Sequence, residues 1–517
     1  MERHYNVSGS NLAHAKKRTI LITISIAYLV VMMDYSIINV ALETLQKDFE
    51  ASNSQLQWAV SSYEIFYSSF LLPTGFIADR YGRKRILLIG LGIFVASSGC
   101  ITFSKTMTEI IIWRAAMGMG GAVVPAATLA IIKDTIHASE QNKAMGIWSA
   151  AGGASVALGP ILGGFLVQSF PWWTVFLINV PIAAICAGFI YCTVPESYNR
   201  TNKSLDVPGI VLSIIGVGSL IFGLIKGGET GQWIDIESGG MLIIGLALIA
   251  VLVTVETHRL DPMLEMSLLR DKSFVSGTMS ISLSYFALSG GTYLLVFFIQ
   301  LIRQNTPFEL GLLMLPVAIG AIVGSLLCDK LLQLFGSKTV VSSGMILLVL
   351  AFLGFSVTNA NTNMILLELY FLSAGLGMGL TMGSTTPLTM TAIPQEKAGS
   401  GAGLTNTIRG ITSIVGVGVL GVVYSLVYRY NVSNVFNDIP NKIPDAAKES
   451  LGQTLNTLHS LQLASKEEII AKSKSAFVTA FHMSMWVAII VLVLGLIVGW
   501  FLLPHKKQFD NRKNEWM

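Results

Sequence analysis

The chain has 517 residues, of which 52% are hydrophobic and only 12% are charged. Soluble proteins carry roughly 25% charged residues, so this composition excludes an ordinary soluble enzyme and indicates a helical membrane protein. The net charge of +4 is small, and no nucleic-acid-binding domain is expected. The sequence lacks a GxxxxGK[ST] loop, an HExxH motif and a GxSxG motif, and its four cysteines have no metal-ligand spacing. It therefore predicts no enzyme, no metal site and no cofactor.

Long apolar runs divide the chain into predicted membrane spans, because a helix needs about 20 apolar residues to cross the bilayer core. Runs of that length predict fourteen spans, at residues 19–42, 56–78, 86–104, 109–132, 144–167, 172–194, 207–225, 239–255, 274–298, 310–328, 339–357, 364–388, 401–428 and 477–503. With an even number of spans, both termini lie on the same side. Most of the 34 Lys and Arg lie on that side, and the positive-inside rule makes it the cytoplasmic one.

The most distinctive stretch, residues 75–85, joins the second and third spans and concentrates two glycines, one acid and four bases. The positive-inside rule accounts for the bases, but it does not account for the glycines and the acid at this spacing. The stretch resembles the loop signature of the major facilitator superfamily. That resemblance implies a loop tied to neighbouring helices in one of two conformations, and hence a gating role for Gly75, Asp79, Arg80, Gly82, Arg83 and Lys84.

The same resemblance implies an all-α polytopic fold of two six-helix bundles and two inserted helices. We expect the first bundle at residues 1–194, the inserted helices at 195–258 and the second bundle at 259–517. Residues 331–338 repeat the loop signature weakly, with Gly336 and Lys338 but without an acid.

Residues 429–475 form the one sizeable segment predicted outside the membrane. The runs that begin at Pro444 and Ser465 each read as a short helix. An external helical hairpin and a solvated linker are equally open interpretations.

Asp34 lies well inside the first predicted span, where an ionisable group is costly and indicates function by default. The run from Met33 to Leu42 resembles the first-helix motif of the fourteen-helix drug:proton antiporters, a family that includes Qac-type, Smv-type and Emr-type multidrug exporters. The resemblance implies that Asp34 couples transport to protons and faces the central cavity. A structural acid bonded to a neighbouring helix is the alternative.

The second predicted span holds Glu64, after Trp58 and Tyr63. Qac-type exporters usually have an aspartate where this chain has Ser61. Glu64 lies about one turn further along, on nearly the same helix face, so it is a candidate substitute in proton coupling. A glutamate paired with a base or a lipid headgroup is equally open. Trp58, Ser61 and Tyr63 are predicted to line the substrate cavity.

Arg114 opens a stretch that resembles the fourth-helix motif of the same family, except that Met117 replaces the usual glutamine. A buried arginine keeps its proton and favours the charged form of nearby acids. The resemblance makes Arg114 part of the proton relay. The alternative is a structural partner for a backbone carbonyl.

The fifth predicted span carries a run of small residues with one proline, which resembles the motif that distinguishes proton antiporters from importers in this superfamily. Small residues let helices approach closely, and proline allows a bend. The motif residues are Gly152, Gly159, Pro160, Gly163 and Gly164. This resemblance points to export.

The thirteenth predicted span departs from the Qac-type pattern. Those exporters carry acids in this helix, whereas this chain has Thr405, Asn406 and Gly410 together with Arg409. Losing the acids weakens the case for divalent organic cations. If Arg409 faces the cavity, it favours neutral or anionic substrates. Asn406 and Arg409 join Asp34 in the predicted substrate cavity.

Together these features predict a proton-coupled antiporter that exports hydrophobic drugs by alternating access, driven by the proton gradient without a cofactor. The expected setting is a bacterial inner membrane, with lipid, protons and a hydrophobic small molecule as partners and a monomer as the oligomeric state. A dedicated exporter of one metabolite, siderophore or antibiotic remains open, and a membrane sensor or enzyme is a remote alternative.

Overall fold

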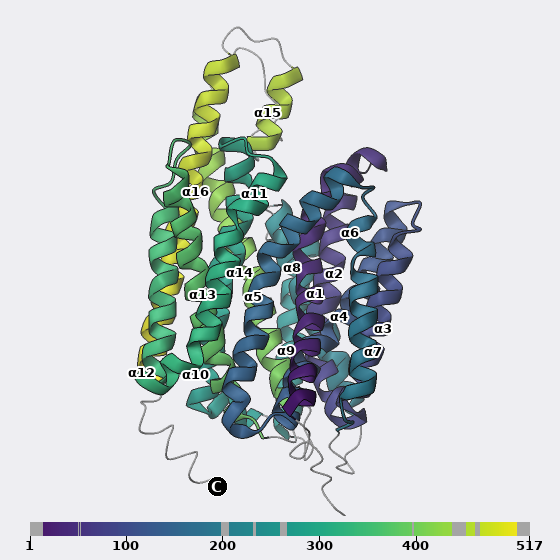
Figure 1. Cartoon of the computed structure of the whole chain (residues 1–517). Helices are drawn as coiled ribbons and strands as arrows, with labels where there is room; N and C mark the ends of the chain where they lie inside the picture. The colour runs from purple at the N-terminus through teal and green to yellow at the C-terminus, as the bar shows by residue number, and fades with distance from the viewer. Residues whose placement is uncertain are drawn as a thin grey trace, which may run out of the picture.

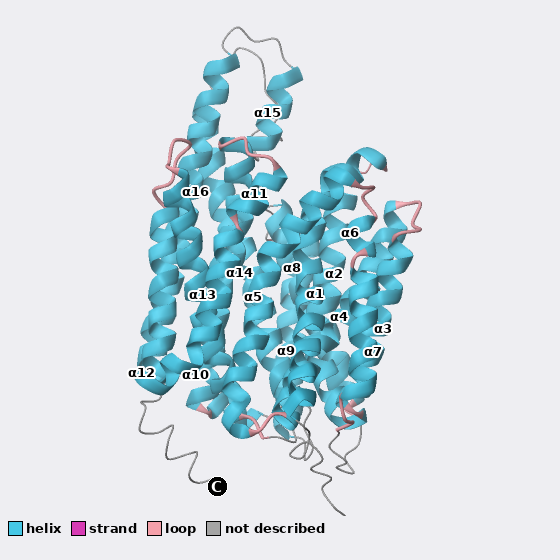
Figure 2. Ribbon diagram, viewed as in Figure 1, coloured by secondary structure: helices cyan, strands magenta, loops and turns pink. Residues whose placement is uncertain are grey.

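The computed structural model describes residues 14–49, 51, 53–197, 206–230, 234–258, 266–394, 398–436, 451–460 and 466–503. Within these ranges every regular element is a helix (Figure 2). Most of the helices run side by side along the long axis of the molecule (Figure 1). The predicted all-α fold is therefore confirmed.

The described residues of the first half of the chain form seven helices. They are α1 (His14–Asp48), α2 (Asn53–Tyr81), α3 (Arg83–Ile101), α4 (Met107–Thr135), α5 (Ala138–Ser169), α6 (Thr174–Leu177) and α7 (Asn179–Thr193). The α1 helix packs against α5 and α7, and α4 packs against α2 and α3. The α4 helix begins after Thr106, whose side chain accepts a hydrogen bond from the Glu109 N–H and so satisfies a free donor of the first turn.

Two helices follow between the halves, α8 (Val207–Thr230) and α9 (Met241–His258), with the short π-helix η1 (Ile236–Gly240) leading into α9. They pack against each other, and α8 also contacts α2 and α14 (Ala398–Phe436). The α9 helix leaves large side chains exposed, such as Ile243 and Leu246. Exposed apolar surface on a helix of this length suits contact with lipid.

The second half contains α10 (Lys272–Phe297), α11 (Pro307–Leu313), α12 (Leu315–Phe355), α13 (Met364–Ala392), α14 and α16 (Lys466–Leu502), with η2 (Met266–Arg270) before α10 and η3 (Phe298–Ile302) after it. The α12 helix contains a break at Gly336, where φ is 80°. Gly82, between α2 and α3, has φ of 111°. Both lie in the region that favours glycine, so the weak repeat in the sequence corresponds to the same kind of sharp turn between two helices.

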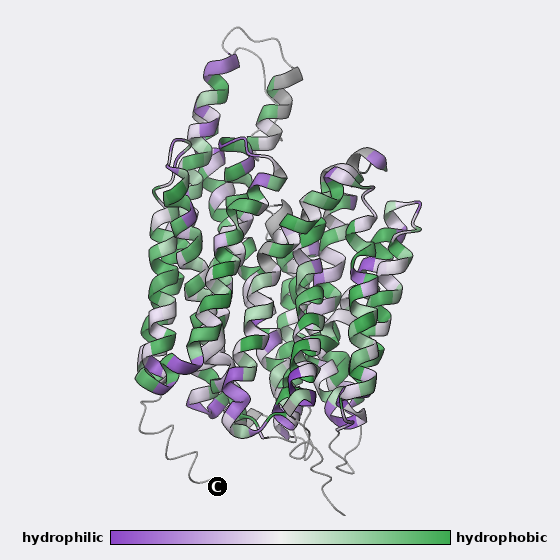
Figure 3. Cartoon of the chain, viewed as in Figure 1, coloured by the Kyte–Doolittle hydropathy of each residue, from purple (hydrophilic) through white to green (hydrophobic). Residues whose placement is uncertain are grey.

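Twelve helices in the described part of the chain are long and apolar enough to cross a membrane. One of them, Phe308–Phe355, is 48 residues long and includes the break at Gly336. The α2 helix has 29 residues and packs among α4, α8 and α14, but it is not one of the twelve. Figure 3 shows apolar residues along most of the helical body. Fourteen spans and the three domain boundaries stay predictions.

The segment predicted outside the membrane contains helix. The α14 helix runs to Phe436, beyond its predicted end at residue 428, and α16 begins at Lys466. The helix expected from Ser465 is therefore the first part of α16, not a separate element. The run expected from Pro444 lies mostly outside the described residues. Between them, α15 (Leu451–Ser460) rises at the end of the molecule opposite the start of α1 (Figure 1).

Candidate functional site

A buried ion pair joins the first and fourth helices. Arg114 Nη1 lies 2.5 Å from Asp34 Oδ2, and the two side chains are 1% and 0% exposed. Asn179, at the start of α7, donates a hydrogen bond from Nδ2 to the other carboxylate oxygen at 2.8 Å. The Asp34 carboxylate is thus held by a cation and an amide from two other helices. Such a group can either keep its negative charge against Arg114 or bind a proton and weaken that attraction.

Arg114 is also anchored to α2. Its Nε donates a hydrogen bond to the Ala59 carbonyl at 3.1 Å, and its guanidinium lies 4.4 Å from the centre of the Tyr63 ring. The Tyr63 hydroxyl in turn donates to the Val31 carbonyl on α1. Tyr63, predicted to line the substrate cavity, therefore belongs to the surroundings of the ion pair. Both interpretations of Arg114, the relay and the carbonyl partner, are compatible with these contacts.

A second polar region lies between the two halves of the chain. A small cavity there is lined by side chains from five helices: Leu129 of α4, Trp148 of α5, Ile281 of α10, Thr385, Thr386, Thr389 and Met390 of α13, and Ala402, Thr405, Asn406 and Arg409 of α14. The cavity wall holds one cation and no acid among these residues. The structure therefore brings Arg409 and Asn406 together at a cavity, whereas Asp34 lies outside its lining.

Aromatic side chains surround Arg409. Its guanidinium lies 4.8 Å from the centre of the Tyr285 ring and interacts electrostatically with Tyr28 of α1 and Tyr67 of α2. Tyr28 stacks on Trp148 with ring centres 3.9 Å apart. The aromatic rings around this cation thus come from both halves of the chain.

The other functional residues predicted in the second span, Trp58, Ser61 and Glu64, lie away from the cavity at Arg409. Trp58 packs against Phe222 of α8 at 5.5 Å between ring centres, so the structure directs it toward an inserted helix. Ser61 is buried on α2. Glu64 is partly buried and interacts with Tyr35 of α1. None of the three lines the cavity at Arg409.

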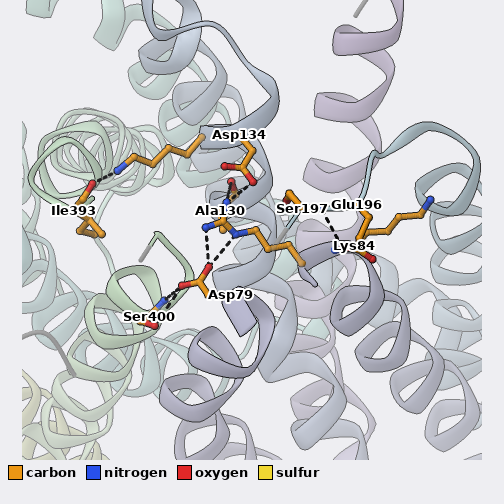
Figure 4. Close-up of polar contacts among 10 residues, drawn as sticks. Asp79, Lys84, Ala130, Asp134, Glu196, Ser197, Ile393 and Ser400 are labelled. Atoms are coloured by element: carbon orange, nitrogen blue, oxygen red, sulfur yellow. Dashed lines mark hydrogen bonds and ion pairs between the residues drawn. The ribbon is translucent and has the colours of Figure 1, made fainter. Parts of the chain in front are cut away.

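The charged loop after α2 forms a network that links the two halves (Figure 4). Arg83 pairs with Asp79 at 2.8 Å and also with Asp134 at the end of α4. The second Asp79 oxygen accepts a hydrogen bond from the Ser400 N–H at 2.9 Å, in the first turn of α14. An acid at a helix N-terminus is favourable. Asp79 therefore holds α14 against the end of α2.

A second contact closes the same end of the molecule. Lys133, near the C-terminal end of α4, donates hydrogen bonds from Nζ to the carbonyls of Met390 and Ile393 at the end of α13. Cations are favourable at helix C-termini. On the other side of the loop, Glu196 accepts from the Lys84 and Arg85 N–H groups. The remaining loop residues are placed nearby: Gly75 is buried and Arg80 lies over the Tyr81 ring.

The small residues of α5 lie at two contacts. On one side, a methyl group on Gly152 would come within 2.6 Å of the Tyr28 ring, and one on Gly159 would meet Ser36, also on α1. On the other side, a methyl on Gly164 would lie 3.4 Å from Phe308 of α11. Gly163 and Pro160 are buried in the same helix. These residues let α5 lie between α1 and the second half of the chain.

Several residues of both regions were not predicted. Nothing in the sequence indicated that Asn179 bonds Asp34. Trp148, Tyr28 and the threonines of α13 gave no sequence signal, because aromatic and hydroxyl side chains are common in membrane helices. The best sequence clue to the contacts at this end of the molecule was the pair of charged residues Lys133 and Asp134, directly after the span predicted at 109–132.

Comparisons with known proteins agree with this architecture. Residues 24–417 match the family model described as Major Facilitator Superfamily. The chain is 29% identical over 510 residues to the tetracenomycin C resistance and export protein of Streptomyces glaucescens, covering 96% of this chain and 93% of that protein. It is 27% identical over 493 residues to the methyl viologen resistance protein SmvA of Salmonella typhimurium, covering 94% and 98%.

Solved structures show the same fold. The human organic anion transporter MFSD10 (TETRAN) aligns with a TM-score of 0.59 at 15% identity, covering 92% of this chain and 99% of that one. At this level of identity the likeness concerns the fold alone.

Proposed function

Because the chain belongs to the major facilitator superfamily, a family of membrane transporters, we propose that it exports hydrophobic organic compounds in exchange for protons. The observation that carries this proposal is the buried Asp34–Arg114 pair, since a single shielded carboxylate is suited to binding and releasing one proton. The names of the relatives, which include antibiotic and methyl viologen resistance, support export of drugs. Membership of a transporter family leaves no reason to retain the sensor or enzyme alternative.

In the proposed cycle, Asp34 gives up its proton on the cytoplasmic side and is then held by Arg114 and Asn179, as in this structure. Protonation from outside removes the negative charge and weakens the pair. The contacts from Asp79 to Ser400 and from Lys133 to α13 keep one end closed. Their loss would let that end open, which makes the loop a gate whose state shifts with protonation.

The proposed setting is a bacterial inner membrane with both termini in the cytoplasm. The support is the distribution of charge: the loop at residues 75–85, with its four bases, lies at the same end as the start of α1 (Figure 1). The positive-inside rule assigns that end to the cytoplasm. The proton gradient supplies the energy in place of a cofactor, and a monomer is the proposed functional unit.

Asp34→Asn tests the proposal, because the amide keeps the shape of the carboxyl group but cannot take up a proton. Purified wild-type and variant chains in liposomes would be given a pH gradient, with efflux of ethidium, efflux of 2-naphthoate and internal pH recorded in parallel. We expect efflux driven by the gradient in wild type and its loss, by at least tenfold, in the variant. Equal gradient-driven transport by both proteins, each shown to be folded, contradicts the role of Asp34.

A dedicated exporter of one metabolite, siderophore or antibiotic is the second candidate. It is favoured by Arg409 and by the absence of acids among the residues that line the cavity, because organic cations would lack a counter-ion there. Proton release on adding several chemically different compounds would favour a polyspecific exporter. A response to one compound among many would favour the dedicated one.

A further inference from the structure

We propose that the cavity at Arg409 binds the anionic group of an aromatic organic acid, whose ring lies against Trp148 in the cavity lining. This inference rests on the proposed transport function for its consequences in the membrane, but the binding itself can be tested alone. It would make an organic anion, instead of an organic cation, the preferred substrate.

The first step of the argument is the charge of Arg409. The side chain is 9% exposed and lies on α14 within the apolar part of the molecule. No carboxylate of the described residues lies within ion-pair distance of it, and its neighbours are the Tyr285 ring and the Tyr28 hydroxyl. A guanidinium keeps its proton even when buried. A cation in this setting is costly unless an anion accompanies it, so a bound anion would be strongly favoured.

The second step is the position of Arg409 at a cavity wall. Thr405 and Asn406 also belong to the lining. Thr405 precedes Arg409 on α14 by about one turn, and Asn406 by slightly less than one turn. Guanidinium groups bind carboxylates through two parallel hydrogen bonds. The cavity thus presents a donor group of the right geometry to a ligand, with no acid in the lining to compete for it.

The third step concerns the body of the ligand. The Tyr28 and Trp148 rings stack with an interplanar angle of 11°, and Trp148 also lines the cavity. The Trp148 indole N–H is already used in a hydrogen bond to Thr128. Tyr28 covers one face of the indole, so a ligand ring would meet the part of Trp148 that lines the cavity, by offset stacking or an edge-to-face contact.

The threonines of α13 add a further preference. Thr385, Thr386 and Thr389 each donate their hydroxyl proton to a carbonyl of the same helix, at 2.7 to 3.0 Å. A hydroxyl that donates in this way has only acceptor capacity left. The threonines of the cavity lining therefore suit hydroxyl or N–H groups on the ligand.

A matched set of probes tests the binding directly. The set is 2-naphthoate, 2-naphthylmethanol and 2-naphthylmethylammonium, which share one ring system and differ in charge. Binding to the full purified chain would be followed by fluorescence at constant chloride. We expect the naphthoate to bind at least tenfold more tightly than the alcohol, and the ammonium more weakly still. Equal affinity for all three, tighter binding of the ammonium, or no binding by any of them overturns the proposal.

Variants locate the effect. Arg409→Gln should weaken naphthoate binding by roughly 10- to 100-fold, as expected for loss of a hydrogen-bonded charge, with little change for the alcohol. Arg409→Lys should retain part of the preference. Arg303→Gln is the matched control, because Arg303 bonds the Thr362 carbonyl outside the cavity. If Arg409→Gln fails to fold, the preference of the wild type among the three probes still decides the question.

Transport separates this inference from the proposed function. If one proton enters on Asp34 for each anion that leaves, every cycle moves two positive charges inward, whereas exchange for a monovalent cation moves none. An inside-negative potential should therefore speed naphthoate export and leave ammonium export unchanged. Preferred naphthoate binding without proton-coupled transport would contradict only the proposed function. Proton-coupled transport that favours the ammonium would contradict only this inference.

Discussion

Two buried arginines, one in each half of the chain, differ in how their charge is balanced. Arg114 lies 2.5 Å from Asp34 and also donates to the Ala59 carbonyl. Arg409 lies over the Tyr285 ring, and the described residues place no carboxylate at ion-pair distance. The first charge is compensated within the protein, while the second is left facing a cavity.

The difference separates the two tasks of an exporter. A cation with an internal partner can respond to the proton on that partner, so Arg114 suits coupling. A cation with no carboxylate partner among the described residues can gain stability from an anionic ligand, so Arg409 suits recognition. The two regions meet through α1, which carries both Asp34 and Tyr28, so a change at the ion pair can reach the cavity through one helix.

The largest expected effect comes from removing the compensated cation. Arg114→Gln would leave the Asp34 carboxylate buried without its counter-ion, and we expect the free energy of unfolding to fall by about 3–5 kcal/mol. Arg409→Gln removes a cation without a counter-ion, so its change should stay within about 1 kcal/mol. Unfolding of the full chain in detergent, followed by tryptophan fluorescence, measures both.

A double variant provides the control for this comparison. Asp34→Asn combined with Arg114→Gln leaves two neutral side chains, so much of the lost stability should return. Equal destabilisation by Arg114→Gln and Arg409→Gln would mean that the two charges are balanced alike, and the distinction between coupling and recognition would have no energetic basis.

The helical fold could be predicted because it follows from the lengths of apolar runs and from the loop at residues 75–85. The special glycines were also visible, since Gly82 and its counterpart Gly336 both follow a stretch of apolar helix and adopt positive φ. Helix ends were less predictable. The α14 helix continues to Phe436, and Tyr428 near its end bonds Thr454 of α15; apolar length alone does not reveal such a contact.

At the candidate sites, the sequence indicated which charged residues matter, but it did not indicate which residues contact each other. Asp34, Arg114 and Arg409 stand out in any apolar run because ionisable residues are rare there. Which arginine faces the acid depends on helix packing: Asp34 and Arg114 are 80 residues apart. The contact of Asn179 with Asp34 also depends on helix packing. In the sequence, an asparagine at the start of a helix could equally be a cap.

The second prediction tests whether the two regions also differ in packing. A methyl group on Gly118, one turn after Arg114, would lie 2.5 Å from the Tyr63 carbonyl oxygen, whereas one on Gly410, beside Arg409, would lie 3.4 Å from Ser68 Oγ. We expect Gly118→Ala to cost about 1–3 kcal/mol by overpacking and Gly410→Ala to cost less than about 0.5 kcal/mol. Unfolding measurements on the two variants, with Gly92→Ala as an unhindered control, decide between them.

The smallest expected difference concerns the tyrosines beside the two cations. The Tyr63 hydroxyl donates a hydrogen bond to the Val31 carbonyl at 3.2 Å in a buried setting. Among the described residues, the Tyr285 hydroxyl has only the Met382 sulfur, at 3.8 Å, as a hydrogen-bond partner, and sulfur is a weak acceptor. Tyr63→Phe should therefore lower the free energy of unfolding by about 0.5–1.5 kcal/mol, and Tyr285→Phe by less.

Both substitutions keep the aromatic ring and so preserve the contact with the neighbouring arginine. Tyr285→Phe should then change naphthoate binding more than it changes stability, because it alters the surroundings of the cation that faces the ligand. Tyr63→Phe should do the reverse. If both variants changed only stability, the Tyr285 ring would be part of the packing, and Arg409 would have to recognise its ligand without the hydroxyl beside it.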